Sequence, residues 1–256
     1  MSKKHRRMLV PSVLALALAG GAAGRLASQD QADKSKISRD SYSLIVETDL
    51  YCSFSIMEQE PAARILANSS GDHLMLSDAD QFYGGPVGAW REGQILQIIE
   101  PGPSVPGVRG NVGYGRGRAR IIRIEGDRFL ARIEKACGPV RIGDGLLPFE
   151  KKSTVEGKDL GYRGILQGGD VLTGRLIFLP DDHDQVGANS YALIDRGLDA
   201  GLQPGQQLTV FGASDGNKSP QAVGIAVVIG AGRATATIKI LSLKDIIRLG
   251  DLVQVK

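Results

Sequence analysis

The chain has 256 residues, of which 42% are hydrophobic, 23% are charged and 5% are aromatic. This balance excludes an intrinsically disordered chain, because such chains combine low hydrophobicity with high net charge. The net charge of +3 belongs to the N-terminus: residues 1–28 hold five of the basic residues and no acid, and the remaining 26 bases against 28 acids give −2. The charge therefore gives no support to nucleic acid as a partner.

Residues 1–28 have the pattern of a secretory signal peptide. A basic stretch, MSKKHRR, precedes the apolar run Met8–Ala19, and the small residues GGAAG follow it. The run is shorter than the roughly 20 residues of a membrane-spanning helix, so we expect no membrane span after cleavage, with an uncleaved anchor as the alternative. Residues 29–41 are polar and predict a flexible mature N-terminus. The expected location is the periplasm or cell envelope.

Export changes the interpretation of the two cysteines, Cys52 and Cys137. In an oxidising compartment two cysteines are a candidate disulfide, and two buried free thiols are the alternative. No His/Cys spacing indicates zinc, and we predict neither a metal nor a cofactor.

A repeated pattern of turns predicts the architecture. VRIGDGLLPF at 140–149 and IIRLGDLVQVK at 246–256 are similar, and 34 glycines with few aromatics are typical of short strands joined by turns. Four further segments recur in the same order, namely 73–80 with 189–197, 90–102 with 202–214, 117–124 with 224–230, and 130–134 with 235–239. The fold class is therefore all-β, with two tandem small β-barrel-like domains that arose by duplication, at 42–150 and 169–256, joined by a linker at 151–168.

The turns within the copies have recognisable chemistry. Glycine accepts positive φ, proline presets φ, and aspartate bonds nearby backbone donors. On this basis the structural turn residues are Gly93, Gly143, Asp144, Pro204, Gly205, Gly250 and Asp251. Adjacent Ile121 and Ile122 break a strand alternation and indicate a bulge. The segment EPAARILANSS at 60–70 is the helix candidate, and 174–187 is expected to be an extra leading strand and loop of the second domain.

Several of these segments carry a family resemblance. DLYCSFS at 49–55, RIGDGLLPFE at 141–150, and the stretches 174–211 and 236–255 resemble exported bacterial proteins in which tandem β domains follow a lysin-motif peptidoglycan-binding module. Each single domain also resembles the C-terminal domain of the flagellar assembly protein T family. The resemblance implies recurring cysteines at Cys52 and Cys137. The lysin motif itself is not found in this sequence, so glycan binding does not carry over.

Three motifs could suggest other chemistry. GASDG at 212–216 fits a hydrolase nucleophile pattern, but that pattern needs a following helix and a histidine after Ser214, and no histidine follows His183. DDHD at 181–184 lacks the spacing of a calcium loop and is expected to be a solvated loop. GYGRGRARIIR at 113–123 resembles an arginine-glycine nucleic-acid segment, but its alternation is typical of the solvent face of a strand. Trp90, which aligns with Leu202, is expected in the core.

The sequence therefore favours an exported, non-enzymatic protein whose β domains bind or scaffold an envelope assembly, with an envelope protein as partner. Two alternatives remain open. The first is a peptidoglycan-associated module, which the family resemblance suggests. The second is a serine hydrolase, which GASDG alone suggests.

Overall fold

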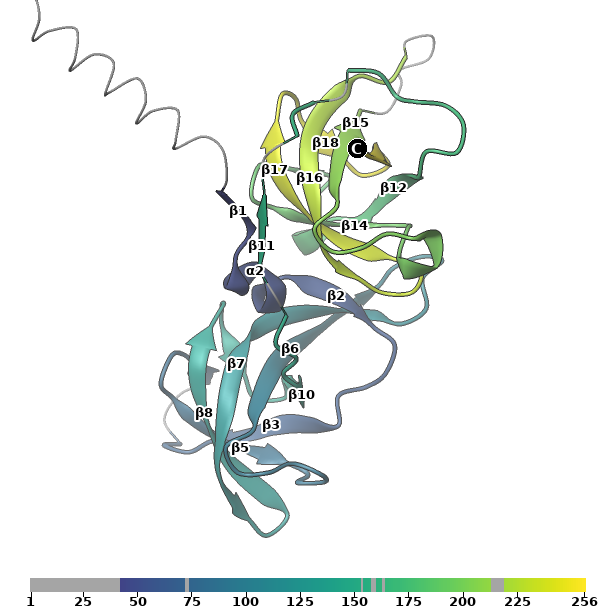
Figure 1. Ribbon diagram of the computed structural model, residues 1–256. Coiled ribbons are helices and arrows are strands. Elements are labelled where there is room, and N and C mark those ends of the chain that lie inside the picture. The colour runs from purple at the N-terminus through teal and green to yellow at the C-terminus, as the bar shows by residue number, and fades with distance from the viewer. Residues whose placement is uncertain (1–41, 72–73, 153, 158–159, 163, 213–218) are drawn as a thin grey trace, which may run out of the picture. The chain divides into compact units, whose positions relative to one another are not determined.

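The computed structural model describes residues 42–256 apart from 72–73, 153, 158–159, 163 and 213–218. These residues form one compact unit whose regular secondary structure is almost entirely β-strand. Two closed six-stranded barrels follow each other along the chain, as the sequence predicts (Figure 1). Among the described residues, no helix is both long and apolar enough to cross a membrane.

The first barrel closes in the order β3-β5-β8-β7-β6-β10, and β10 pairs back to β3. Its strands are β3 (Ala63–Asn68), β5 (Gln81–Gly85), β8 (Arg128–Ala136), β7 (Asn111–Glu125), β6 (Ile95–Ser104) and β10 (Gly145–Pro148). Strand β2 (Phe54–Met57) pairs with β7, and β4 (Met75–Leu76) forms a short ribbon with β9 (Val140–Arg141).

The second barrel has the same ring order, β12-β14-β17-β16-β15-β19. Its strands are β12 (Thr173–Phe178), β14 (Tyr191–Ile194), β17 (Ala236–Leu243), β16 (Ala222–Ala231), β15 (Gln207–Phe211) and β19 (Leu252–Val255). A ribbon of β13 (Gln185–Val186) with β18 (Ile247–Arg248) corresponds to β4–β9, and two short 3-10 helices lie at η1 (Pro180–Asp182) and η2 (Leu198–Ala200). The shared order of the two rings supports the duplication that the sequence indicates.

The repeated Arg-aliphatic-Gly-Asp segment forms the same turn in both barrels. In the first, the Asp144 carboxylate accepts a hydrogen bond from the Arg141 amide at 2.8 Å, and the Asp144 amide donates to the Arg141 carbonyl at 3.2 Å. In the second, Asp251 makes both bonds to Arg248 at 2.8 and 3.1 Å. The glycines have φ of 96° at Gly143 and 91° at Gly250, so the turn needs a left-handed residue at this position.

Gly250 provides a direct test of this turn. Its φ of 91° is unfavourable for any residue with a Cβ, although no neighbouring atom would obstruct one. We expect Gly250→Val to lower the free energy of unfolding by about 1–3 kcal/mol. Gly187 also has open space around it and has an ordinary φ, so Gly187→Val is the matched control in urea titrations. Equal losses in the two variants would contradict a conformational cause.

Asp144 makes the first turn sensitive to pH. Burial raises the pKa of Asp144 above its ordinary value of 3.8, against the lowering effect of the bond from the Arg141 amide. A group whose pKa is raised in the folded state stabilises the fold fully when the pH is below its pKa in the unfolded state. This stabilisation is lost as the pH rises through its pKa in the folded state. Unfolding measured from pH 3 to 7 should therefore show wild type losing stability relative to Asp144→Asn as the pH rises. A difference that is constant or grows in favour of wild type would contradict this.

A second duplicated turn leads into β6 and β15. The Gln94 side chain accepts a bond from the Arg91 amide at 3.2 Å, and the Gln206 side chain accepts one from the Gln203 amide at 2.8 Å. The amides of Gly93 and Gly205 donate to Ile121 and Val228, at 2.8 Å in both barrels. Pro204 precedes Gly205, whose φ is 90°. These bonds fix Ile121 and Val228 as corresponding residues.

The bulge predicted at Ile121 and Ile122 is present in the first barrel, and the second barrel has one at the corresponding position. The pairing of β7 with β8 shifts between Ile121 and Arg123, and that of β16 with β17 shifts between Val228 and Gly230. Each barrel also has a core of its own, with Trp90 in the first and Leu202 in the second, as predicted. The duplication therefore extends from turns to packing.

The helix expected at 60–70 is wrong, because residues 63–68 form strand β3. Ala63 and Ile65 are buried while Arg64 and Leu66 are exposed, and this alternation lets β3 pair with both β5 and β10. Barrel closure here outweighs the helical propensity of Ala, Arg and Leu. The expected helix left β12 without a counterpart in the first barrel, and β3 is that counterpart. The Ile65 amide donates to the Asp144 backbone carbonyl and the Leu176 amide donates to the Asp251 backbone carbonyl, both at 2.9 Å. Strand β12 is therefore not an extra strand.

Two of the sequence matches were out of register. Strand β14 corresponds to β5, which begins after the segment 73–80 that was matched to it. The Ile133 and Ile240 amides donate to Asp80 and Ser190, which places 130–134 against 237–241 rather than 235–239. The expected matches rested on short apolar runs, which look alike in several registers. The equivalent turn bonds define which residues of the two barrels correspond.

The chain before the first barrel packs on the second one. Strand β1 (Tyr42–Ile45) pairs with β11 (Val155–Gly157), and the helix α2 (Glu47–Cys52) follows it (Figure 1). A cluster of apolar side chains joins this segment to the outer surface of β14, β16 and β17. It consists of Leu44, Ile45, Leu50, Tyr191, Val227, Ile229 and Leu241. The helix was not predicted.

A buried ion pair fixes α2 at this position. Asp49 is 4% exposed, and its carboxylate accepts bonds from Lys239 Nζ at 2.8 Å and Tyr191 Oη at 2.9 Å. The Val46 amide donates to the same carboxylate at 2.9 Å. The tyrosine and lysine are neighbours in the β14–β17 pairing. One carboxylate therefore links the N-terminal segment to two strands of the second barrel.

The segment expected as a linker also lies on the second barrel. The Gln254 side chain accepts a bond from the Gln167 amide at 2.9 Å and donates one to its carbonyl at 2.7 Å. The Gln207 side chain accepts from the Leu160 amide at 3.0 Å. Two largely buried glutamines thus satisfy backbone groups of the connecting chain.

Candidate interaction face

A row of charged side chains covers the outer surface of β7 and β8. We call this surface the arginine face and define it by Arg118, Arg120, Ile122, Arg132 and Glu134. The predicted alternation explains its origin, because Ala119 and Ile121 are buried in the core while Arg118 and Arg120 point outward. Ile122 is the bulged residue and is 42% exposed.

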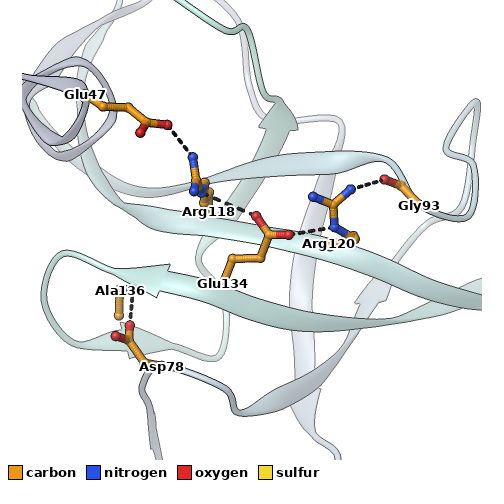
Figure 2. Close-up of polar contacts among 7 residues, drawn as sticks. All are labelled: Glu47, Asp78, Gly93, Arg118, Arg120, Glu134 and Ala136. Atoms are coloured by element: carbon orange, nitrogen blue, oxygen red, sulfur yellow. Dashed lines mark hydrogen bonds and ion pairs between the residues drawn. The ribbon is translucent and has the colours of Figure 1, made fainter.

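Ion pairs order the centre of this face (Figure 2). Glu134 accepts from Arg120 Nε at 2.6 Å and lies 3.3 Å from Arg118 Nε. Arg118 also donates to Glu47 of α2 at 2.6 Å, and Arg120 donates to the Gly93 carbonyl at 2.9 Å. The Arg118 guanidinium lies 5.4 Å from the Tyr51 ring centre. These arginines are therefore held in fixed positions rather than left as mobile side chains.

The edge of the face is ordered by Asp78. Its carboxylate accepts from the Ala136 amide (Figure 2). It also accepts from Lys135 Nζ at 3.0 Å. These two bonds lower the pKa of Asp78 below its ordinary value, the backbone bond most strongly. The aspartate therefore remains a charged acceptor at neutral pH.

Two shallow hollows meet on the arginine face. One, of about 440 Å³, is lined by Glu47, Gln94, Ile95, Arg118, Arg120, Glu134, Phe149 and Lys151. The other, of about 460 Å³, is lined by Asp78, Ala79, Arg120, Ile122, Arg132, Ile133 and Glu134. Both contain Arg120 and Glu134, so they form one continuous surface with charged and apolar parts. Fixed arginines beside an exposed isoleucine suit contact with another protein, because arginine is enriched at interfaces.

The glycine-arginine motif has a packing role in this face. A Cβ on Gly115 would lie 2.0 Å from the Tyr51 carbonyl oxygen, and the Gly115 amide donates to Ser53 at 2.8 Å. Gly117 has φ of 142° and would place a Cβ 2.1 Å from the Lys135 carbonyl oxygen. Gly115 lets the end of α2 and the residue after it approach β7 closely, and Gly117 does the same for strand β8.

The disulfide predicted between Cys52 and Cys137 is present. It joins the last residue of α2 to the residue after β8, with the two Cα atoms 5.4 Å apart. It therefore fixes the end of α2 to the first barrel, while Asp49 fixes the same helix to the second.

The other sequence candidates lie elsewhere. Ser214 of the GASDG motif lies outside the described residues. Asp181 and His183 lie at η1, and the described part of the chain contains no group of three or more His, Cys, Asp or Glu side chains arranged to hold a metal ion. Burial, together with Asp49, raises the pKa of Tyr191 well above its ordinary value. This tyrosine is therefore unsuited to act as a base at neutral pH.

Comparison with known proteins adds no assignment. No family model matches the sequence, and no curated protein matches it.

Proposed function

We propose that this protein is an exported, non-enzymatic cell-envelope protein whose tandem barrels bind or scaffold an envelope assembly, with the arginine face as the contact surface. Residues 1–28 support export through their signal-peptide pattern, and the Cys52–Cys137 disulfide is compatible with an oxidising compartment. The resemblance to lysin-motif-associated proteins and to the flagellar assembly protein T family supports an envelope role.

One observation carries the choice of surface. The barrels have the same strand order, so β7–β8 corresponds to β16–β17. The outer surface of β16–β17 carries Lys239 among apolar side chains and is covered by β1 and α2 of the same chain. The corresponding surface of β7–β8 carries exposed arginines and two hollows. In the second barrel this surface is covered by the chain itself, and we propose that a partner covers the corresponding surface of the first barrel.

A charge reversal tests this proposal. Arg132 and Arg64 are both exposed strand arginines of the first barrel, on β8 and β3. Crosslinking and pull-down from native envelopes should recover a specific protein with wild type and Arg64→Glu, and lose it with Arg132→Glu. Intact mass should show removal of the signal residues.

Two outcomes would contradict the proposal. The first is saturable pelleting of the purified chain with peptidoglycan sacculi without any protein partner, which would favour the peptidoglycan-associated alternative. The second is partner recovery that is equal for Arg132→Glu and Arg64→Glu, which would exclude the arginine face as the contact surface.

A further inference from the structure

Corresponding residues occupy the centres of the two outer surfaces. The turn bonds show that Ile133 corresponds to Ile240, so Arg132 of β8 corresponds to Lys239 of β17. Both barrels have a bulge at the same place, so Ile122 of β7 corresponds to Ile229 of β16. Each surface therefore has one cation and one isoleucine at the same two positions.

In the second barrel both positions are covered by the N-terminal segment. Lys239 Nζ donates to the Asp49 carboxylate at 2.8 Å. Ile229 is 3% exposed and packs in one cluster with Ile45 and Leu50. A short segment with a carboxylate and adjacent aliphatic residues is thus the ligand that this surface accepts within its own chain.

In the first barrel the described part of the chain leaves the same two positions exposed. Arg132 is exposed and forms no ion pair with any described residue, and Ile122 is 42% exposed. Both line the hollow of about 460 Å³. The two acids of that hollow are already engaged, Asp78 by Lys135 and Glu134 by Arg118 and Arg120. Among the described residues, the hollow therefore has one cation without an acidic partner, Arg132.

Residues 43–52 of the same chain are not available to fill this position. Asp49 is held by the second barrel, and the disulfide holds Cys52 against Cys137. Glu47 of the same helix pairs with Arg118 at 2.6 Å. Residues 43–52 therefore supply no carboxylate to Arg132, and another molecule can supply one.

We propose that the arginine face binds an acidic protein segment with an aliphatic residue beside its carboxylate, chemically similar to residues 43–52 of this chain. The carboxylate pairs with the Arg132 guanidinium, and the aliphatic side chain covers Ile122. An arginine-carboxylate pair can be bidentate, which adds orientation to charge. This inference rests on the proposed function, since it names the partner of the same face.

The probe is a fluorescent peptide of residues 43–52 with Cys52→Ser, titrated into the purified full chain and followed by anisotropy. We expect saturable binding that Arg132→Glu weakens at least tenfold and that Arg64→Glu leaves unchanged. A peptide with Glu47→Gln and Asp49→Asn should bind at least tenfold more weakly. Higher salt should weaken binding, because the pair is exposed.

Methyl NMR identifies the surface that the peptide occupies. The Ile122 methyl signals should shift on titration while those of Ile229 stay in place. No binding to wild type, equal affinity for Arg132→Glu, or shifts at Ile229 alone would overturn the inference. If the peptide fails while Arg132→Glu still loses the envelope partner, the partner chemistry is wrong and the proposed contact face stands.

Discussion

Replacing Asp49 with alanine should lower the free energy of unfolding by about 3–5 kcal/mol, the range typical of breaking a buried ion pair from one side. The change leaves Lys239, whose side chain is 13% exposed, with its charge unpaired. It also removes the acceptor of the Tyr191 hydroxyl and of the Val46 amide. Urea unfolding followed by circular dichroism measures the loss.

The double variant Asp49→Ala with Lys239→Met separates charge from packing. Removing both charges should restore much of the lost stability, because replacing a buried ion pair with apolar groups is often close to neutral. An Asp49→Ala loss below 1 kcal/mol, or a double variant less stable than the single one, would show that this carboxylate does not hold α2 on the second barrel.

Loss of the Cys52–Cys137 disulfide should also have a large effect, of about 2–4 kcal/mol. The bond closes a loop between residues 85 positions apart, so it restricts the unfolded chain strongly. It also joins α2 to the first barrel, and its loss should increase hydrogen exchange in α2. Wild-type protein unfolded with and without reductant gives the comparison.

The variant Cys52→Ala with Cys137→Ala provides the control. It should have the stability of reduced wild type, and reductant should not change its unfolding curve. Identical unfolding of oxidised and reduced wild type would contradict a stabilising role for the disulfide.

The turns made the duplication readable from the sequence. Gly143 with Asp144 and Gly250 with Asp251 have local reasons for their identity, namely a left-handed backbone and a side-chain bond within four residues. Such local chemistry is visible in sequence. The strand at 63–68 was missed because its alternation covers few residues, and pairing with distant strands decides its conformation.

The sequence predicted only part of the candidate face. The outward direction of Arg118 and Arg120 followed from alternation, as predicted. Their partners did not, because Glu47 and Glu134 are brought to them by the fold across 71 and 14 residues. The link of Asp49 to Lys239 spans 190 residues, and no local pattern indicates it.

One outer surface is closed by the chain itself, and we propose that the corresponding surface binds a partner. Photo-crosslinking in native envelopes tests it most directly, with a benzophenone amino acid placed at Arg132 or, in a separate variant, at Arg64. We expect a discrete protein adduct from position 132 and none from position 64. Adducts of equal yield from both positions, or no protein adduct from position 132, would contradict it.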